Sequence, residues 1–433
     1  MGNGQLFDDE TLKAPEQDVG VEEKPGDPRL RTANRRQVQL RPCDLESLLE
    51  ADHEARSLWT LLERLDLSAF YAKIRARGSA PGRAATDPKI LLCLWTYATS
   101  QGVGSARRLA CLCEEHDAYR WICGGVTVNH DMLAEFRVGC GAELDGVLTE
   151  LLAVLLEGGL VTLRRVAHDG MRVRASAGAA SFRREKTLQR CRYEARQQLA
   201  HVKKLVDEDP ARSQERAAQE RAAKDRQDRI ERALKRMADM QKRQGKEARV
   251  STTDPDAKVM KMPDGGYRPA YNVQLATDVD SRVVVGVSVT NVGSDAGLLL
   301  PMLDRVEERL AAPEELLVDG GFVKLQAIDA AENRGVTVYA PVPTPRKPDI
   351  DPHERKPNDT DATAAWRARM ATDEAKEVYR DRAATAETTN ADLRQHRGLT
   401  QFFVRGIPKV TTVALLVAFS YDMLRAISLG ILG

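Results

Sequence analysis

The chain of 433 residues shows no strong net charge, no signal-peptide pattern in its first residues and no long uninterrupted apolar run. Its 65 Lys and Arg residues nearly balance 64 Asp and Glu residues, so the formal net charge of +1 neither predicts nor excludes nucleic-acid binding. The first ten residues are polar and acidic, without the basic and apolar segments of a signal peptide. Residues 413–432 are the most apolar stretch, but Asp422 and Arg425 interrupt them. We therefore predict a buried closing helix there and no membrane span.

Cysteine is also scarce, and its spacing does not fit a metal or disulfide framework. Seven cysteines are scattered along the chain without a C-x-x-C pair. Cys111 and Cys113 would point to different faces of one helix, which argues against a zinc site with His116, Cys123 and His130. We predict buried cysteines and helix-end histidines instead. An odd number of cysteines without a leader favours a reducing cytoplasm as the location.

Acidic residues gather at the beginning of the chain. Residues 1–35 are rich in Pro, Gly, Asp and Glu and show no apolar periodicity, which is typical of a disordered tail. Because this tail is acidic, the rest of the chain is correspondingly basic. The sequence therefore allows a local phosphate-binding surface, although positive and negative residues are nearly equal in number over the whole chain.

Residues 36–160 follow a helical pattern, with apolar positions spaced by helical turns. Ser105 and Asn129 stand where they can cap two short helices. Helices joined in this way are compatible with a helix-turn-helix reader of DNA. An ordinary helical packing domain fits the same spacing equally well, so both interpretations stay open from the pattern alone.

Residues 183–249 are almost entirely charged residues, Ala and Gln, with two thin apolar seams. The first seam comprises Leu199, Val202, Leu205 and Val206, and the second comprises Ile230, Leu234, Met237 and Met240. Residues 207–210 separate them, which predicts an antiparallel helical hairpin. Such a hairpin can lie along DNA or against a second subunit, or it can simply be solvated on its charged faces.

The remaining sequence, 161–182 and 250–433, alternates strand and helix signals. Residues 271–276 and 283–290 predict a β-hairpin, and strands are also expected at 316–319 and 336–340. Helices are expected at 297–310, at 325–333 and through most of 366–432. We predict an α/β fold, specifically an α+β mixed sheet flanked by helices, compatible with a ribonuclease-H-like catalytic domain over 161–433 that carries residues 183–249 as an insert.

Three acidic residues could form a metal site within this domain. Asp169 and Asp319 each follow a short apolar strand pattern and precede glycine, and Glu387 lies in a helical stretch. Carboxylates placed in this way suit a pair of divalent ions, which activate an oxygen nucleophile and neutralise the leaving oxygen in phosphodiester chemistry.

The helix of Glu387 also carries residues suited to DNA. Tyr379, Arg382 and Arg394 fall within a broad arc that contains Glu387, so Arg394 could grip a phosphate while the other two orient DNA or brace the acid.

Each acidic signal is weak by itself. An Asp before Gly is usually a turn former, and a helical Glu is usually on the surface. Asp373, Glu374 and Glu377 are rival acids near Glu387.

Several long segments, taken together, resemble the DDE transposases of bacterial insertion sequences, in the branch with an N-terminal helical domain and a long insert after the first catalytic Asp. They are VAHDGMRVRASAGAASFRR from Val166, STTDPDAKVMKMPDGGYRPAYNVQLATD from Ser251, NVGSDAGLLLPML from Asn291, ELLVDGGF from Glu315 and YRDRAATAETTNADLRQHRGLTQFFVRGIPKV from Tyr379. The segment from Ala85 to Gly125 resembles the N-terminal domain of the family. The resemblance implies that residues 36–160 form a helical DNA-binding domain.

The family's catalytic, metal-binding acids fall on Asp169, Asp319 and Glu387. Its signature around the glutamate, a Tyr, an Arg and a later basic residue, falls on Tyr379, Arg382 and Arg394, which the resemblance assigns to DNA binding. The interval from Arg382 to Glu387 is one residue longer than the commonest spacing, and Arg394 stands where Lys is common.

The resemblance implies a Mg²⁺-dependent enzyme, with Mn²⁺ expected to substitute, that cuts double-stranded DNA at the terminal inverted repeats of a mobile element and joins the ends to target DNA. A homo-oligomer on DNA and a cytoplasmic, nucleoid-associated location in a bacterium are expected. An alternative is a catalytically silent repeat-binding protein, a domesticated or decayed transposase. A coiled-coil scaffold, suggested only by residues 183–249, is disfavoured by the strands on both sides.

Overall fold

A six-stranded mixed sheet forms the centre of the computed structural model, which describes residues 44–78, 84–208, 213–244, 248–345 and 351–432 and isolated positions before residue 44. The strands are β1 (Arg165–Arg174), β4 (Lys258–Lys261), β5 (Tyr267–Asp278), β6 (Val284–Thr290), β7 (Glu315–Val318) and β8 (Thr337–Tyr339). Their order is β4-β5-β1-β7-β8, and β6 pairs with β5. The β1–β7 and β7–β8 pairs are parallel, and the others are antiparallel. The predicted mixed α/β fold is confirmed, whereas the tail predicted for 1–35 falls almost wholly outside the described residues.

The hairpin of β5 and β6 forms where the alternating sequence predicts it. The side chain of Asp278 accepts hydrogen bonds from the backbone N–H of Ser281 at 2.9 Å and from its hydroxyl at 2.6 Å. This local bonding closes the turn, because a short Asp side chain can satisfy backbone donors a few residues ahead.

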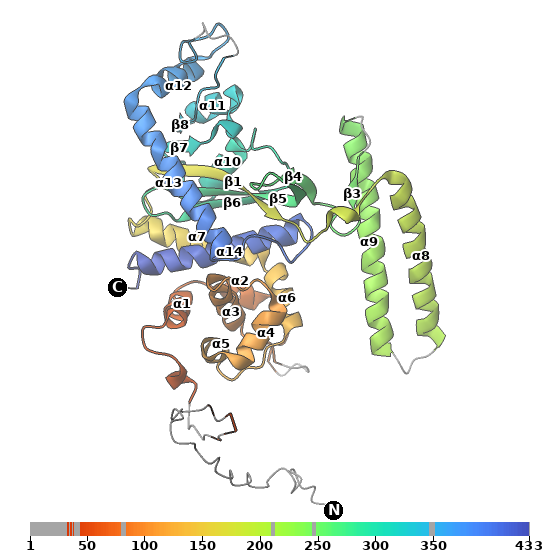
Figure 1. Cartoon of the computed structure of the whole chain (residues 1–433). Helices are drawn as coiled ribbons and strands as arrows, with labels where there is room; N and C mark the ends of the chain where they lie inside the picture. The colour runs from red at the N-terminus through yellow and green to blue at the C-terminus, as the bar shows by residue number, and fades with distance from the viewer. Residues whose placement is uncertain are drawn as a thin grey trace, which may run out of the picture. The chain divides into compact units, whose positions relative to one another are not determined.

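Helices cover both faces of the sheet, as Figure 1 shows. These are α10 (Leu299–Arg309), α11 (Leu325–Glu332), α12 (Asp361–Ala371), α13 (Asp373–Gln395) and α14 (Ile407–Ser428). Gly286 pairs with Ala276, which pairs with His168, and a Cβ on Gly286 would touch Met302 and Val306 of α10. Helix α10 therefore lies on the face of His168, and Asp169 points to the other face because strand side chains alternate.

The N-terminal region consists of short helices, with the 3₁₀ turn η2 (Glu46–Leu48) first. They are α1 (Glu54–Glu63), α2 (Ser68–Ala72), α3 (Pro88–Ser100), α4 (Ala106–Glu115), α5 (Asp117–Cys123), α6 (His130–Gly139) and α7 (Gly141–Glu157). Ser105 accepts the backbone N–H of Arg108 and Asn129 accepts that of Met132, so both predicted caps are confirmed.

Helix α14 connects these helices to the sheet. It packs against α3, α6, α7 and β6. The Ser420 hydroxyl donates to the carbonyl of Thr96 at 2.6 Å, and Asp422 accepts the backbone N–H of Val284 at 2.8 Å. Among the described helices, α14 alone has the length and composition to cross a membrane, but 72% of its apolar window is buried inside the structure. It is a core helix, as predicted.

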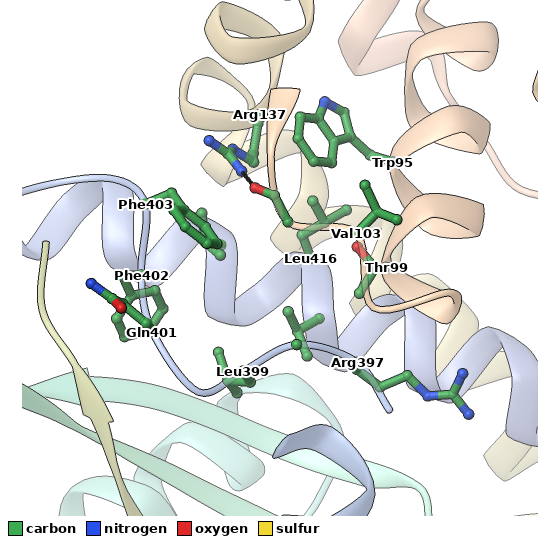
Figure 2. Close-up of a pocket in the computed structure, with 14 residues that line it drawn as sticks. Trp95, Thr99, Val103, Arg137, Arg397, Leu399, Gln401, Phe402, Phe403 and Leu416 are labelled. Carbon is green, nitrogen blue, oxygen red and sulfur yellow. Dashed lines mark hydrogen bonds between the residues drawn. The ribbon is translucent and has the colours of Figure 1, made fainter. Parts of the chain in front are cut away.

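The segment between α13 and α14 also contacts the N-terminal helices. Figure 2 shows Phe402, Phe403 and Leu399 of this segment lining a cavity with Trp95 and Arg137. The Arg137 guanidinium lies 4.5 Å from the centre of the Trp95 ring and donates to the carbonyl of Gly104. The lining is mainly apolar, so we interpret this cavity as a small gap in the core.

Two long charged helices follow β1 in sequence. They are α8 (Glu185–Glu208) and α9 (Ser213–Gln244), preceded by η3 (Ala179–Ser181) and β2 (Phe182–Arg183) and followed by β3 (Val250–Ser251), which pairs with β2. Leu188 near the start of α8 packs with Ala233 and Met237 near the end of α9, so the helices are antiparallel. Arg236 binds Asp256 at 3.0 Å and attaches α9 to the loop before β4.

Candidate active site

Asp169 and Asp319 lie side by side, the first on β1 and the second directly after the neighbouring parallel strand β7. The register of β1 and β7 pairs Arg165 with Glu315 and His168 with Val318. Asp169 is the next residue of β1 and Asp319 is the first residue after β7, so pairing two segments distant in sequence brings their carboxylates to one place. Asp319 follows β7 and begins the 3₁₀ turn η5 (Gly320–Phe322), whose Gly321 N–H it accepts at 2.8 Å.

The position of Asp169 differs from the sequence prediction. The Asp-Gly pair predicts a carboxylate at a strand end before a glycine turn, but β1 continues through Gly170 to Arg174. Gly170 is required for a different reason: a Cβ there would lie 2.5 Å from Oδ1 of Asp295 and 3.0 Å from Oδ1 of Asn272. The glycine therefore gives room for polar side chains, not for a turn.

Helix α13 places Arg382 between the two aspartates. One guanidinium nitrogen, Nη2, lies 3.3 Å from Oδ1 of Asp169 and 3.9 Å from Oδ2 of Asp319. The Arg382 and Asp169 side chains are 14% and 17% exposed, so solvent screens their attraction only partly. Burial raises the pKa of Asp169 above its ordinary value, and Arg382 acts in the opposite direction.

Tyr379 and Arg394 flank this ion pair on the same helix. Burial raises the pKa of Tyr379, which lies in the field of Arg382 and both aspartates. Burial lowers the pKa of Arg394, and the nearby Asp169 opposes that shift. The structure therefore brings Asp169, Asp319 and the three predicted DNA-binding residues of α13 together.

Glu387 does not join them in this conformation. Its side chain is exposed on α13. Across the described ranges, no three or more His, Cys, Asp or Glu residues are placed to share a metal ion. The catalytic role of Glu387 stays a prediction.

Two known families match the chain, each over a different part. Residues 245–423, which include Asp319 and Glu387, match the family described as transposase DDE domain. Residues 43–138 match the family described as transposase domain (DUF772). The chain belongs to the DDE transposases of the insertion-sequence type. Comparison with curated proteins and with solved structures gives no match.

Membership of this family fixes the function at a coarse level. A DDE transposase binds DNA, cleaves it and transfers strands, so this chain is an enzyme of DNA transposition. Asp169 lies before the matched DDE segment, and its link to the site rests on the pairing of β1 with β7.

The carboxylates of the transposase fit a divalent cation, the usual requirement of the family. Carboxylate oxygens are the ligands that Mg²⁺ prefers, and here two of them converge from adjacent strands. The Arg382 guanidinium lies between the two carboxylates and partly neutralises their negative charge, which a bound cation would also do.

Sequence reasoning missed a buried polar network behind Asp169, on the opposite face of the sheet. Oδ1 of Asp295 accepts hydrogen bonds from Asn272 at 2.7 Å and Gln274 at 2.9 Å, and its Oδ2 binds Arg172 at 2.6 Å. Gln274 bonds in turn to Nε2 of His168 at 2.8 Å. Since the Gln274 amide nitrogen donates to Asp295, its oxygen accepts, and His168 is the donor. The alternating polar residues of β5 were the available signal.

Sequence reasoning also missed Asn390 of α13. Its side-chain nitrogen donates to Oδ2 of Asp169 at 2.9 Å. A single amide on a charged helix has no pattern that distinguishes it from a solvent-facing residue, so only the packing of α13 on β1 identifies it.

Proposed function

We propose that this transposase binds the terminal inverted repeats of a mobile element, cleaves DNA at its ends and transfers the strands to target DNA with two divalent ions. Mg²⁺ is the proposed ion, and Mn²⁺ would substitute. The adjacency of Asp169 and Asp319 with one cationic group between them carries this proposal. The carboxylates of Asp169 and Asp319 would supply two of the three acidic ligands of such a metal site.

Asp169, Asp319 and Glu387 would hold the ions. When bound, such ions activate the attacking oxygen and stabilise charge on the leaving oxygen. Glu387 is exposed on the same helix as Arg382, so rotation of its side chain could bring it toward the aspartates as DNA binds. Asp169 and Asp319 already lie next to each other and need no such rearrangement.

Arg382, Arg394 and Tyr379 would bind the DNA backbone beside the cleaved bond. Arg394 is half-buried and, in the described part of the chain, has no carboxylate within ion-pair distance, which leaves its guanidinium available to a phosphate. The helices of residues 36–160 would read the repeats, and the hairpin of α8 and α9 would lie along DNA or against a second subunit. A homo-oligomer on DNA, in the bacterial cytoplasm, completes the proposal.

A second candidate is a silent repeat-binding protein. It is favoured by the exposed position of Glu387 and by the contacts of Arg382 and Asn390, which engage both oxygens of Asp169. Such a protein would bind element-end DNA without Mg²⁺, as seen by a shift of the DNA in a native gel, and would never nick it.

End cleavage on a plasmid carrying the element's own ends tests the proposal. The parent protein should cut at the ends with Mg²⁺, and Asp169→Asn, Asp319→Asn and Glu387→Gln should reduce cutting to background while DNA binding persists. Glu377→Gln is the matched control, since Glu377 is an exposed acid of α13 that pairs with Arg380. A parent that binds but never cuts would favour the silent protein, and an active Asp169→Asn variant would refute the assigned site.

A further inference from the structure

The two contacts of α13 with Asp169 differ in a way that matters for a metal ion. Arg382 brings a positive charge to Oδ1, whereas Asn390 brings a neutral N–H donor to Oδ2. A dication entering between the aspartates repels the first group and does not repel the second. The Asn390 contact can therefore persist when the site is loaded, while Oδ1 faces the ion.

Small buried residues bring the helix close enough for a short side chain to reach. Thr385, Ala386 and Thr389 are each at most 3% exposed, and α13 packs directly against β1 through this region. Asn390 lies half-buried at its edge. Among the described contacts, the bond to Asp169 is the only hydrogen bond of the Asn390 side chain.

Asn390 also sits where two rows of residues meet on α13, one with Glu387 and Arg394 and the other with Arg382. Glu387, Asn390 and Arg394 are spaced by three and four residues, so they form one row along the helix. Arg382, Ala386 and Asn390 form a second row with a spacing of four. A bond from Asn390 to Asp169 thus fixes the distance and rotation of the turn that carries Glu387.

We propose that Asn390 is a positioning residue: it holds Asp169 through Oδ2, leaves Oδ1 to the cation, and docks the turn of Glu387 onto β1. The inference rests on the proposed function, because it assumes that Asp169 binds the ion. Partners that orient a metal-binding carboxylate typically change metal affinity or activity about 10- to 100-fold when they are removed.

Mn²⁺ binding to the full-length protein without DNA tests this role, with free Mn²⁺ measured by electron paramagnetic resonance. Asn390→Ala should raise the Kd about tenfold, the lower end of that range. Asn390→Leu, whose side chain has the same number and branching of heavy atoms, should give the same shift and keeps the test valid if the alanine variant folds poorly. Thr388→Ala is the control, since Thr388 is exposed on α13 and donates to the carbonyl of Ala384 in its own helix.

The outcomes separate this inference from the proposed function. A raised Kd with a melting temperature close to the parent's, and a lower kcat for cleavage with an unchanged KM for DNA, would support positioning. An unchanged Kd in Asn390→Ala or Asn390→Leu, while Asp169→Asn abolishes binding, would overturn the role of Asn390 alone. If Asp169→Asn and Asp319→Asn both bind Mn²⁺ like the parent, the proposed site itself is wrong.

Discussion

At the residue scale, Arg382 stabilises the two aspartates in the absence of a metal ion, but it also obstructs the binding of one. Without DNA it compensates the charge of Asp169 and Asp319, which would otherwise repel each other across neighbouring strands. Its position between them is also the position that a dication needs. Metal binding must therefore move the guanidinium, and a DNA phosphate is a suitable new partner for it.

Replacing Arg382 by Gln should strengthen Mn²⁺ binding to the DNA-free protein. A partly buried ion pair of this kind contributes about 1 kcal/mol, so its removal should lower the Kd about fivefold. Cleavage of element-end DNA should fall, because a phosphate contact is lost. Arg380→Gln, which removes an exposed arginine paired with Glu377, serves as the control in the same titration. Equal or weaker binding by the Arg382 variant would show that the guanidinium does not compete with the ion.

At the element scale, α13 is attached to the sheet by a second arginine. Arg165 of β1 donates through Nε to Glu315 of β7 at 2.6 Å and through Nη1 to Asp381 of α13 at 2.6 Å. Its side chain is only 13% exposed. One largely buried guanidinium thus joins β1 and β7 to the helix that completes the site.

Replacing Arg165 by Met should loosen α13. The change leaves Glu315 and Asp381 without their shared partner, and we expect the free energy of unfolding to fall by about 1–2 kcal/mol in a urea titration, discounted because Asp381 is partly solvated. Hydrogen exchange should accelerate in α13 more than in α14. Arg164→Met is the matched control, since Arg164 makes a 3.6 Å exposed ion pair with Asp280. Similar effects of the Arg165 and Arg164 substitutions would contradict the attachment of α13 to the sheet through Arg165.

Helix α14 carries a buried acid that should make stability depend on pH. Burial raises the pKa of Asp422 well above its usual value, against the opposing hydrogen bond from Val284 and the charges of Arg309 and Arg425. The folded protein therefore holds this proton to a higher pH than the unfolded chain does. The contribution of Asp422 to stability is therefore present at low pH and declines as the pH rises through the folded-state pKa.

The Asp422→Asn variant should lack this decline. Its amide oxygen can still accept the Val284 N–H, and no charge is buried, so at pH 8 it should unfold at higher urea than the parent. The difference should shrink at pH 5. Asp361→Asn, at a side chain that is 94% exposed, should show no such dependence. Lower stability of the Asp422 variant at pH 8 would mean that the acid is charged and paired with its neighbouring arginines.

At the scale of the whole molecule, local sequence signals predicted the individual helices, strands and turns better than the contacts between them. The caps at Ser105 and Asn129 and the turn at Asp278 depend on hydrogen bonds from the backbone three residues later to the side chain. Such local hydrogen bonds can be predicted from the residue types alone. The hairpin of β5 and β6 followed from alternation of apolar residues, and the mixed sheet followed from the order of strand and helix signals along the chain. The short edge strand β4 was missed, because its four residues carry lysine at both ends.

The site could be predicted only in part, because its geometry arises between distant segments. The acid positions were identifiable, and Asp169 and Asp319 meet through the parallel pairing of β1 with β7. The turn predicted at Gly170 is wrong, because nothing near this residue in sequence indicates that Asp295 lies behind it. Asn390 could not be found without the packing of α13. The division into domains and the role of Glu387 stay predictions.

Convergence of Asp169, Asp319 and Glu387 around shared ions is the central claim, and localised backbone cleavage measures it directly. Fe²⁺ added to the transposase with element-end DNA, followed by ascorbate and peroxide, generates radicals that cut the protein chain next to the bound ion. We expect fragments that end near residues 169, 319 and 387, which excess Mg²⁺ and Asp319→Asn suppress. Cuts near the two aspartates with none in α13 around residue 387, or no Mg²⁺-sensitive cuts at all, would contradict the account.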